Sequence, residues 1–183
     1  MASAECIAAE QVWSWVSVDS TDLCCRSLGI TCEDNRITKV SIPFQQQSGY
    51  LNESIGKLTA LTWLDISANQ YYGPIPAEIE NLVSLTYLDM SLNFFTSMPT
   101  TFSRLTSLQT INLKNNLILG SIPSSIGNMK DLNYLSLAYN QFTGPVPSEL
   151  GNLRNLTYLN LQNNWLNETV PDTLKALPDL KIM

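Results

Sequence analysis

The feature that most constrains this chain is a short segment that recurs along most of its length. Copies of this segment begin at Leu64, Leu88, Ile111, Leu135 and Leu159, so successive copies are 24, 23, 24 and 24 residues apart. A degenerate copy precedes them at residues 40–42, and a truncated one ends at residue 183. Repetition at such a period is typical of a solenoid, in which each repeat forms one coil and buries its apolar face against the next.

Each repeat has two halves with different structural preferences. The first half follows the pattern Leu-x-x-Leu-x-x-Leu-x-Leu-x-x-Asn, and its alternating Leu-x-Leu predicts a short strand. The second half contains Gly-x-Ile-Pro, which turns the chain across the back of the coil. We expect the side chains that return to the core there to be Ile79, Phe102, Ile126, Leu150 and Leu174.

An asparagine follows the predicted strand in each of the five copies from Leu64 to Leu159. A buried amide must satisfy its donors and acceptors, and neighbouring coils offer backbone groups that can do so. The sequence therefore predicts a buried ladder of asparagines formed by Asn69, Asn93, Asn116, Asn140 and Asn164.

These units resemble the plant-type subclass of leucine-rich repeats. The resemblance covers about six repeats and the start of a seventh, over residues 36–183. It implies an α/β fold: a right-handed solenoid with a parallel sheet on its concave face, and short helical or 3-10 segments and turns on its convex side. The repeat at residues 95–99 is one residue short and lacks the glycine, Glu168 replaces the glycine of the last full repeat, and Gln45 replaces the first asparagine.

Residues 1–35 do not repeat, and we expect them to cap the first coil. Residues 8–15 predict a short helix whose tryptophans cover that coil. The run from Cys24 to Cys32 resembles the cysteine cap of plant extracellular leucine-rich-repeat proteins, which implies the pairs Cys6–Cys24 and Cys25–Cys32. Four cysteines allow three disulfide pairings. From the residues alone, free thiols and a metal site also remain alternatives to disulfides.

Disulfides indicate an oxidising compartment, so we expect an extracellular or cell-surface protein. Three glycosylation sequons, at Asn52, Asn155 and Asn167, agree with that location. However, residues 1–5 show no secretory leader pattern, and a cytoplasmic homologue is the alternative.

Composition excludes several classes of function. The chain has no histidine, which removes the Ser-His-Asp and Cys-His constellations and histidine-based zinc sites. Its net charge of −6 argues against nucleic acid as a partner, and no apolar run is long enough to insert into a membrane. No phosphate-binding loop is present, so we expect no cofactor and no metal.

The residues beside the buried leucines are expected to point outward on the concave face. Four aromatic side chains fall in one outward column, and such side chains either anchor a partner or only stabilise the sheet. Two aspartates lie beside these aromatic side chains on neighbouring strands. Their like charges repel each other unless a cation or a basic partner binds there. The candidate partner-binding residues are Trp63, Asp65, Tyr87, Asp89, Phe94, Tyr134, Tyr139, Tyr158 and Trp165.

We do not expect an enzyme. A glycosidase needs two carboxylates in different environments, whereas Asp65 and Asp89 occupy equivalent positions on an open sheet. The leading expectation is a receptor-like ectodomain that recognises a protein or peptide ligand. The alternatives are a secreted inhibitor of a wall-degrading enzyme such as polygalacturonase, and a purely structural repeat protein. The seventh repeat stops early, which indicates a fragment or an end covered by another molecule, such as a co-receptor.

Overall fold

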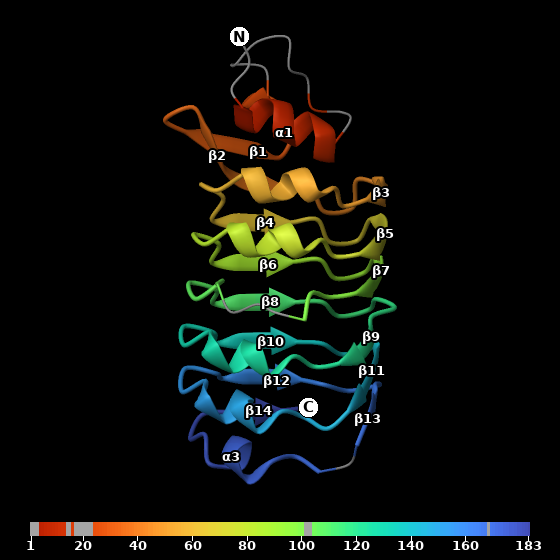
Figure 1. Cartoon of the computed structure of the whole chain (residues 1–183), viewed down its shortest axis with the longest axis vertical. Helices are drawn as coiled ribbons and strands as arrows, with labels where there is room; N and C mark the ends of the chain where they lie inside the picture. The colour runs from red at the N-terminus through yellow and green to blue at the C-terminus, as the bar shows by residue number, and fades with distance from the viewer. Residues whose placement is uncertain (1–3, 14–15, 17–23, 101–103, 168) are drawn as a thin grey trace.

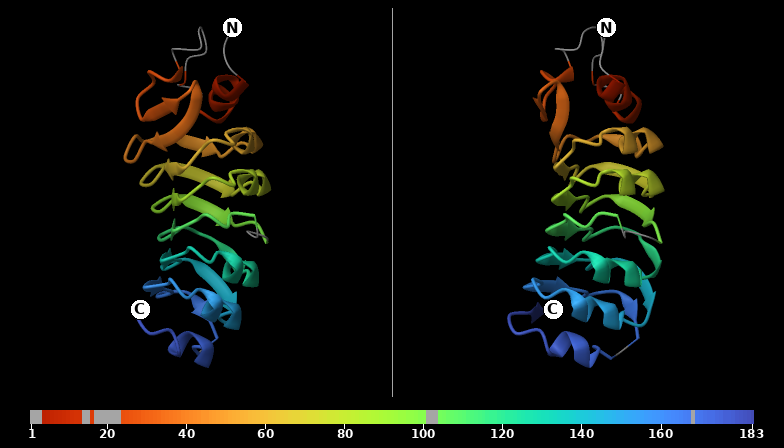
Figure 2. Two further views of the ribbon diagram at one scale, coloured as in Figure 1. Left: turned by 90° about the vertical axis from the view of Figure 1, so that its left-hand side faces the viewer. Right: turned by 60° about the vertical axis from the view of Figure 1, so that its left-hand side comes forward.

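The protein is an elongated stack of coils with a helical cap at one end (Figure 1). The computed structural model describes residues 4–13, 16, 24–100, 104–167 and 169–183. In the views of Figure 2, the strands of one long sheet line one side of the stack and the short helical segments line the opposite side. A single apolar core runs through the stack from Cys6 to Leu174.

Eight strands form the long sheet, which we call the concave sheet. Only β1 and β2 pair antiparallel, and the others pair parallel in the order of the repeats. The middle residue of each three-residue strand, from Leu64 to Leu159, is fully buried. The strands are β1 (Ile30–Glu33), β2 (Arg36–Ser41), β4 (Trp63–Asp65), β6 (Tyr87–Asp89), β8 (Thr110–Asn112), β10 (Tyr134–Ser136), β12 (Tyr158–Asn160) and β14 (Lys181–Ile182).

Two smaller sheets, the lateral sheets, lie where the chain leaves the concave strands, in a region for which the sequence predicts only turns. The first contains β3 (Ser48–Tyr50), β5 (Gln70–Pro74) and β7 (Phe94–Ser97), and the second contains β9 (Leu119–Ser121), β11 (Gln141–Gly144) and β13 (Trp165–Leu166). The boundary between them coincides with the repeat that is one residue short. The pairing of β5 with β7 already shifts register there, between Gly73 and Pro74.

Short helical segments cross the back of five coils within the described residues. The segments η2 (Ala77–Asn81), η3 (Ser124–Asn128), η4 (Ser148–Asn152) and α3 (Asp172–Lys175) each follow a proline, and η1 (Glu53–Lys57) follows Asn52. A proline suits this place because its fixed φ leads into a helical turn without a backbone donor to satisfy. The side chains that these segments return to the core are Ile55, Ile79, Ile126, Leu150 and Leu174. Phe102 lies outside the described residues.

The asparagines after the concave strands link each coil to the one before it. The Asn93 amide donates to Ile66 O at 2.9 Å and to Met90 O at 3.2 Å, and its Oδ1 accepts from Tyr71 N at 3.0 Å. The other four make the same kinds of bond. The expectation of burial is wrong for Asn164, which is partly exposed because only the last, incomplete coil covers it.

The cap is held by a helix, two disulfides and one buried carboxylate. The helix α1 covers Ala4–Val12, so it begins and ends earlier than residues 8–15, and Trp15 lies outside the described residues. Disulfides join Cys6 to Cys24 and Cys25 to Cys32. The Glu5 carboxylate accepts from Arg36 Nη2 at 2.7 Å and from Ile37 N at 2.7 Å, which ties the helix to the first coil.

The last strand pairs one residue earlier than the 24-residue period predicts. Ile182, and not Met183, lies opposite Leu159 in the pairing of β12 with β14. Among the described residues, only β12 pairs with this two-residue strand. Ile182 and Met183 are 40% and 52% exposed.

Candidate functional site

The outward column at the start of the concave strands carries four aromatic rings in two stacks. Trp63 and Tyr87 are register partners on β4 and β6, and their ring centroids are 3.6 Å apart with an interplanar angle of 5°. Tyr134 and Tyr158 stack at 4.5 Å and 3° on β10 and β12. All four side chains are partly buried. The two stacks form rigid apolar surfaces that end in polar atoms.

The column is interrupted at β8, where Thr110 stands between Tyr87 and Tyr134. A hollow of about 330 Å³ opens at this position. It is lined by Tyr87, Asp89, Thr110, Asn112, Asn133 and Tyr134. The sequence predicted neither the hollow nor the role of Thr110 and Asn133 in it. The signal was present, because a small residue in a column of aromatics leaves a gap between its neighbours.

Asp65 and Asp89 are register partners on β4 and β6, and each accepts a hydrogen bond from the serine two residues after it. Asp65 Oδ1 accepts from Ser67 N at 3.0 Å, and Asp89 Oδ1 accepts from Ser91 N at 2.9 Å. The Oδ2 atom of Asp89 accepts from Asn112 Nδ2 at 2.8 Å as well. These bonds hold both carboxylates in fixed positions on a partly buried surface.

The negative charge of this surface affects the tyrosines around the hollow. Burial, followed by the charges of Asp89 and Asp65, raises the pKa of Tyr87 to about 12. Burial and the neighbouring Tyr158 raise the pKa of Tyr134 as well. Both tyrosines therefore stay neutral at physiological pH, and the surface between them favours a cation over an anion.

Three of the predicted partner-binding residues lie outside the concave sheet. Phe94 and Trp165 begin the lateral strands β7 and β13, and Tyr139 precedes β11 in the connecting turn. Each of these turns contains a residue in the left-handed conformation, which directs the chain away from the concave strand. Tyr139 is itself such a residue, with φ of 56°. Phe94, Tyr139 and Trp165 are 50%, 46% and 64% exposed.

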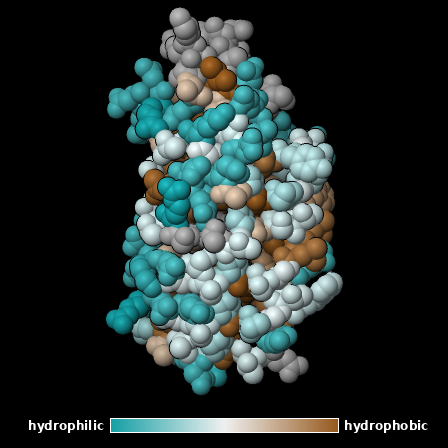
Figure 3. Space-filling view, viewed as in Figure 1, coloured by the Kyte–Doolittle hydropathy of each residue, from teal (hydrophilic) through white to brown (hydrophobic). Residues whose placement is uncertain are grey.

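An exposed apolar row on the lateral sheets was not predicted from the sequence. Tyr50, Tyr72 and Phe94 are successive register partners across β3, β5 and β7. Leu117 and Leu119, in the next coil that the structure describes, are exposed as well. Apolar surface is visible on the side of the molecule where β7 and β9 lie (Figure 3). An alternating strand pattern could have signalled the row, but each lateral strand is too short to show one.

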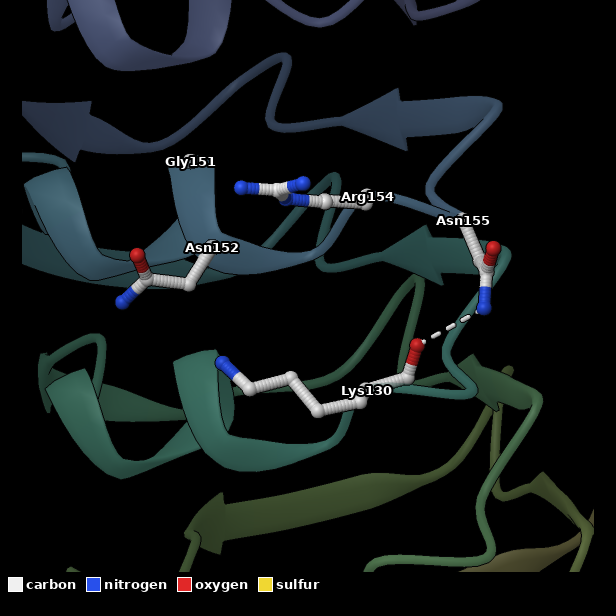
Figure 4. Close-up of a pocket in the computed structure, with 5 residues that line it drawn as sticks. All are labelled: Lys130, Gly151, Asn152, Arg154 and Asn155. Carbon is white, nitrogen blue, oxygen red and sulfur yellow. Dashed lines mark hydrogen bonds between the residues drawn. The ribbon is translucent and has the colours of Figure 1, made fainter.

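A larger hollow of about 570 Å³ lies where η3 and η4 lead into β10 and β12. Lys130 and Arg154 both border it, together with Gly151, Asn152 and Asn155 (Figure 4). Asn155 Nδ2 donates to Lys130 O at 2.9 Å, and Lys130 Nζ donates to Gly127 O at 2.7 Å. Asn155 is also the acceptor residue of a sequon, so a glycan at that site would cover this basic hollow.

Two further features bear on metal binding and on membranes. The sulfur atoms of Cys6, Cys24 and Cys25 lie within 4.8 Å of one another. Each of them belongs to a disulfide, so none offers the thiolate that a metal ion would need. Within the described part of the chain, none of the helices has the length and apolar character needed to cross a bilayer.

Comparisons with known proteins agree with this geometry. Residues 35–183 match a family model described as a leucine-rich repeat region. Receptor-like kinase TMK2 of Arabidopsis thaliana is 36% identical over 98 residues, which are 52% of this chain and 11% of that protein. The chain therefore spans about a tenth of this relative.

Solved plant ectodomains share the fold over nearly the whole chain. The leucine-rich-repeat ectodomain of GASSHO1/SCHENGEN3 from Arabidopsis thaliana, in complex with CASPARIAN STRIP INTEGRITY FACTOR 2, has a TM-score of 0.89 at 28% identity and covers 97% of this chain and 23% of that one. The Arabidopsis receptor kinase HAESA, in complex with the peptide hormone IDA and the co-receptor SERK1, has a TM-score of 0.86 at 25% identity. The match covers 98% of this chain and 33% of that one.

Proposed function

Because the chain belongs to the leucine-rich repeat family, we propose that it is an extracellular recognition module that binds a protein or peptide on its concave sheet. In this proposal, residues 1–35 cap the solenoid and residues 36–183 carry the binding surface. The observation that carries it is the pair of aromatic stacks, Trp63 with Tyr87 and Tyr134 with Tyr158. Large rigid rings with polar tips contribute binding energy at a low cost in side-chain entropy.

The placement of the three sequons supports this surface. Asn52 precedes η1, Asn155 lies between η4 and β12, and Asn167 follows β13, so none of them belongs to a concave strand. We propose that all three carry glycans. Sugars at these positions would cover the back and sides of the coils and leave the concave sheet accessible.

The partner in this proposal is a basic protein or peptide, because the chain is acidic and its concave surface holds two aspartates. HAESA was solved with both a peptide hormone and a co-receptor. By analogy, we assign co-receptor packing to the apolar side chains of Ile182, on the last strand, and Met183, which follows that strand. The proposal includes no catalysis and assigns both carboxylates to partner binding. Each accepts from the serine two residues later, and Asp89 accepts from Asn112 and the Tyr87 hydroxyl as well.

Two other roles make different predictions. A secreted inhibitor would bind a purified polygalacturonase and lower its activity. A structural repeat protein would use the aromatic stacks for stability alone, since stacked cross-strand rings contribute about 0.5–1.5 kcal/mol each.

The experiment is a selection of random peptides for binding to the immobilised chain, followed by affinity measurements with variants. The concave variant replaces Trp63, Tyr87, Tyr134 and Tyr158 with alanine. A matched control replaces Tyr50, Tyr72 and Trp165, which are exposed aromatics of the lateral sheets. Thermal unfolding followed by circular dichroism shows that each variant folds.

We expect selected peptides to lose about tenfold or more in affinity for the concave variant and to bind the control unchanged. The proposal is wrong if the selected peptides bind the folded concave variant as tightly as the original chain, or if only the lateral control loses binding. A concave variant that loses stability and no binding supports the structural role instead.

A further inference from the structure

The gap in the aromatic column at β8 has the shape of a binding site for one planar side chain. Trp63 covers one face of the Tyr87 ring and Tyr158 covers one face of the Tyr134 ring. Because the rings stack along the column, the uncovered face of each tyrosine is turned towards the gap over Thr110. Two aromatic faces therefore border the same hollow from opposite sides.

The width of the gap follows from the strand spacing. Neighbouring strands lie about 4.8 Å apart, so β6 and β10 are separated by about 9.6 Å. A planar group placed midway would lie about 4.8 Å from each ring, which is within the roughly 6 Å over which a cation interacts with an aromatic face. A third aromatic ring in this position would only complete the column, whereas the native threonine leaves a volume of about 330 Å³ open.

The negative charge of Asp89 beside the gap favours a cationic ligand. Asp89 lies in the lining, and its Oδ2 atom accepts from Asn112 Nδ2 at 2.8 Å and from the Tyr87 hydroxyl at 3.4 Å. These bonds fix the carboxylate in place. Two lysines of neighbouring coils contact aromatic rings: Lys39 Nζ lies 4.7 Å from the Trp63 ring centroid, and Lys114 Nζ lies 5.4 Å from that of Tyr139.

We propose that the Thr110 hollow binds an arginine side chain of the partner, with its guanidinium between Tyr87 and Tyr134 and paired with Asp89. This inference rests on the proposed function and specifies the chemistry of its ligand. Arginine fits better than lysine because its planar guanidinium stacks on both ring faces and presents donors along its edge. An ammonium group would satisfy Asp89 but would contact only one ring closely.

The test is a titration of the isotope-labelled chain with the peptide acetyl-Gly-Arg-Gly-amide, followed by amide chemical shifts. The matched ligand contains citrulline, which has the shape of arginine without its charge. Thr110→Tyr fills the hollow with a residue that the neighbouring strands already carry. Lys39→Tyr adds a tyrosine to the same column outside the hollow and serves as the control variant.

We expect saturable shifts centred on Asp89, Thr110 and Asn112, with about tenfold weaker binding of the citrulline peptide, equal to about 1.4 kcal/mol. Thr110→Tyr should abolish these shifts and Lys39→Tyr should retain them. The inference is wrong if citrulline binds equally well, if the shifts lie elsewhere, or if Thr110→Tyr binds like the original chain. Peptides selected on the concave sheet that are unaffected by Thr110→Tyr would leave the proposed function standing and overturn this inference alone.

Discussion

Removing one asparagine from the middle of the ladder should destabilise the solenoid far more than removing one from its end. Asn93→Ala deletes the acceptor of the buried Tyr71 amide and the donors to Ile66 O, Met90 O and Ser91 O. An orphaned buried donor costs about 1–3 kcal/mol and each lost bond about 1 kcal/mol. Counting the two amide protons as two lost bonds, we expect a loss of about 3–5 kcal/mol. This lowers the melting temperature by about 6–20 °C for a chain of this size.

Asn164→Ala is the matched control, because Asn164 makes the same kinds of bond on a partly exposed surface. Water can replace its side chain there, so we expect a loss of about 1 kcal/mol. The assay combines thermal unfolding with amide hydrogen exchange, in which the Tyr71 amide should exchange about 100-fold faster in Asn93→Ala. Equal destabilisation by the two substitutions, or an unchanged Tyr71 exchange rate, would refute the argument.

Three further predictions concern the cap, one turn and pH. Glu5→Gln should lower the unfolding free energy by about 2 kcal/mol, because it removes the charge that binds Arg36 and the first coil; denaturant titration measures this. In the same assay, Gly73→Ala should lower the unfolding free energy by about 2 kcal/mol more than Gly120→Ala. Both glycines have positive φ, but only a Cβ added at Gly73 would meet the Tyr50 ring, at 2.5 Å. Burial raises the pKa of Tyr71 to about 12, so stability should be constant below pH 10 and fall as pH rises towards 12, and Tyr71→Phe should reduce that fall.

The period of the repeat predicts the concave sheet because each coil repeats the same buried leucines at the same spacing. The strands from β4 to β12 lie where Leu64 and its equivalents place them. The pairing of Cys6 with Cys24 follows from the family resemblance and not from spacing alone.

The lateral sheets could not be predicted in the same way. Their strands have two to five residues, and Gly73-Pro74 within β5 is typical of a turn rather than a strand. For the same reason, the repeat pattern predicts Phe94 and Trp165 on the concave surface, although they belong to lateral strands. The hollow at Thr110 involves side chains of three strands, so its signal emerges only when the same position is compared across successive repeats.

The most direct test of the account is hydroxyl-radical footprinting of the aromatic side chains, free and in complex with a selected peptide. If the concave sheet binds the peptide, oxidation of Trp63, Tyr87 and Tyr134 falls in the complex, while that of Tyr50 and Tyr72 on the lateral sheet stays unchanged. Protection confined to Tyr50 and Tyr72, with the concave aromatics oxidised as in the free chain, would contradict it.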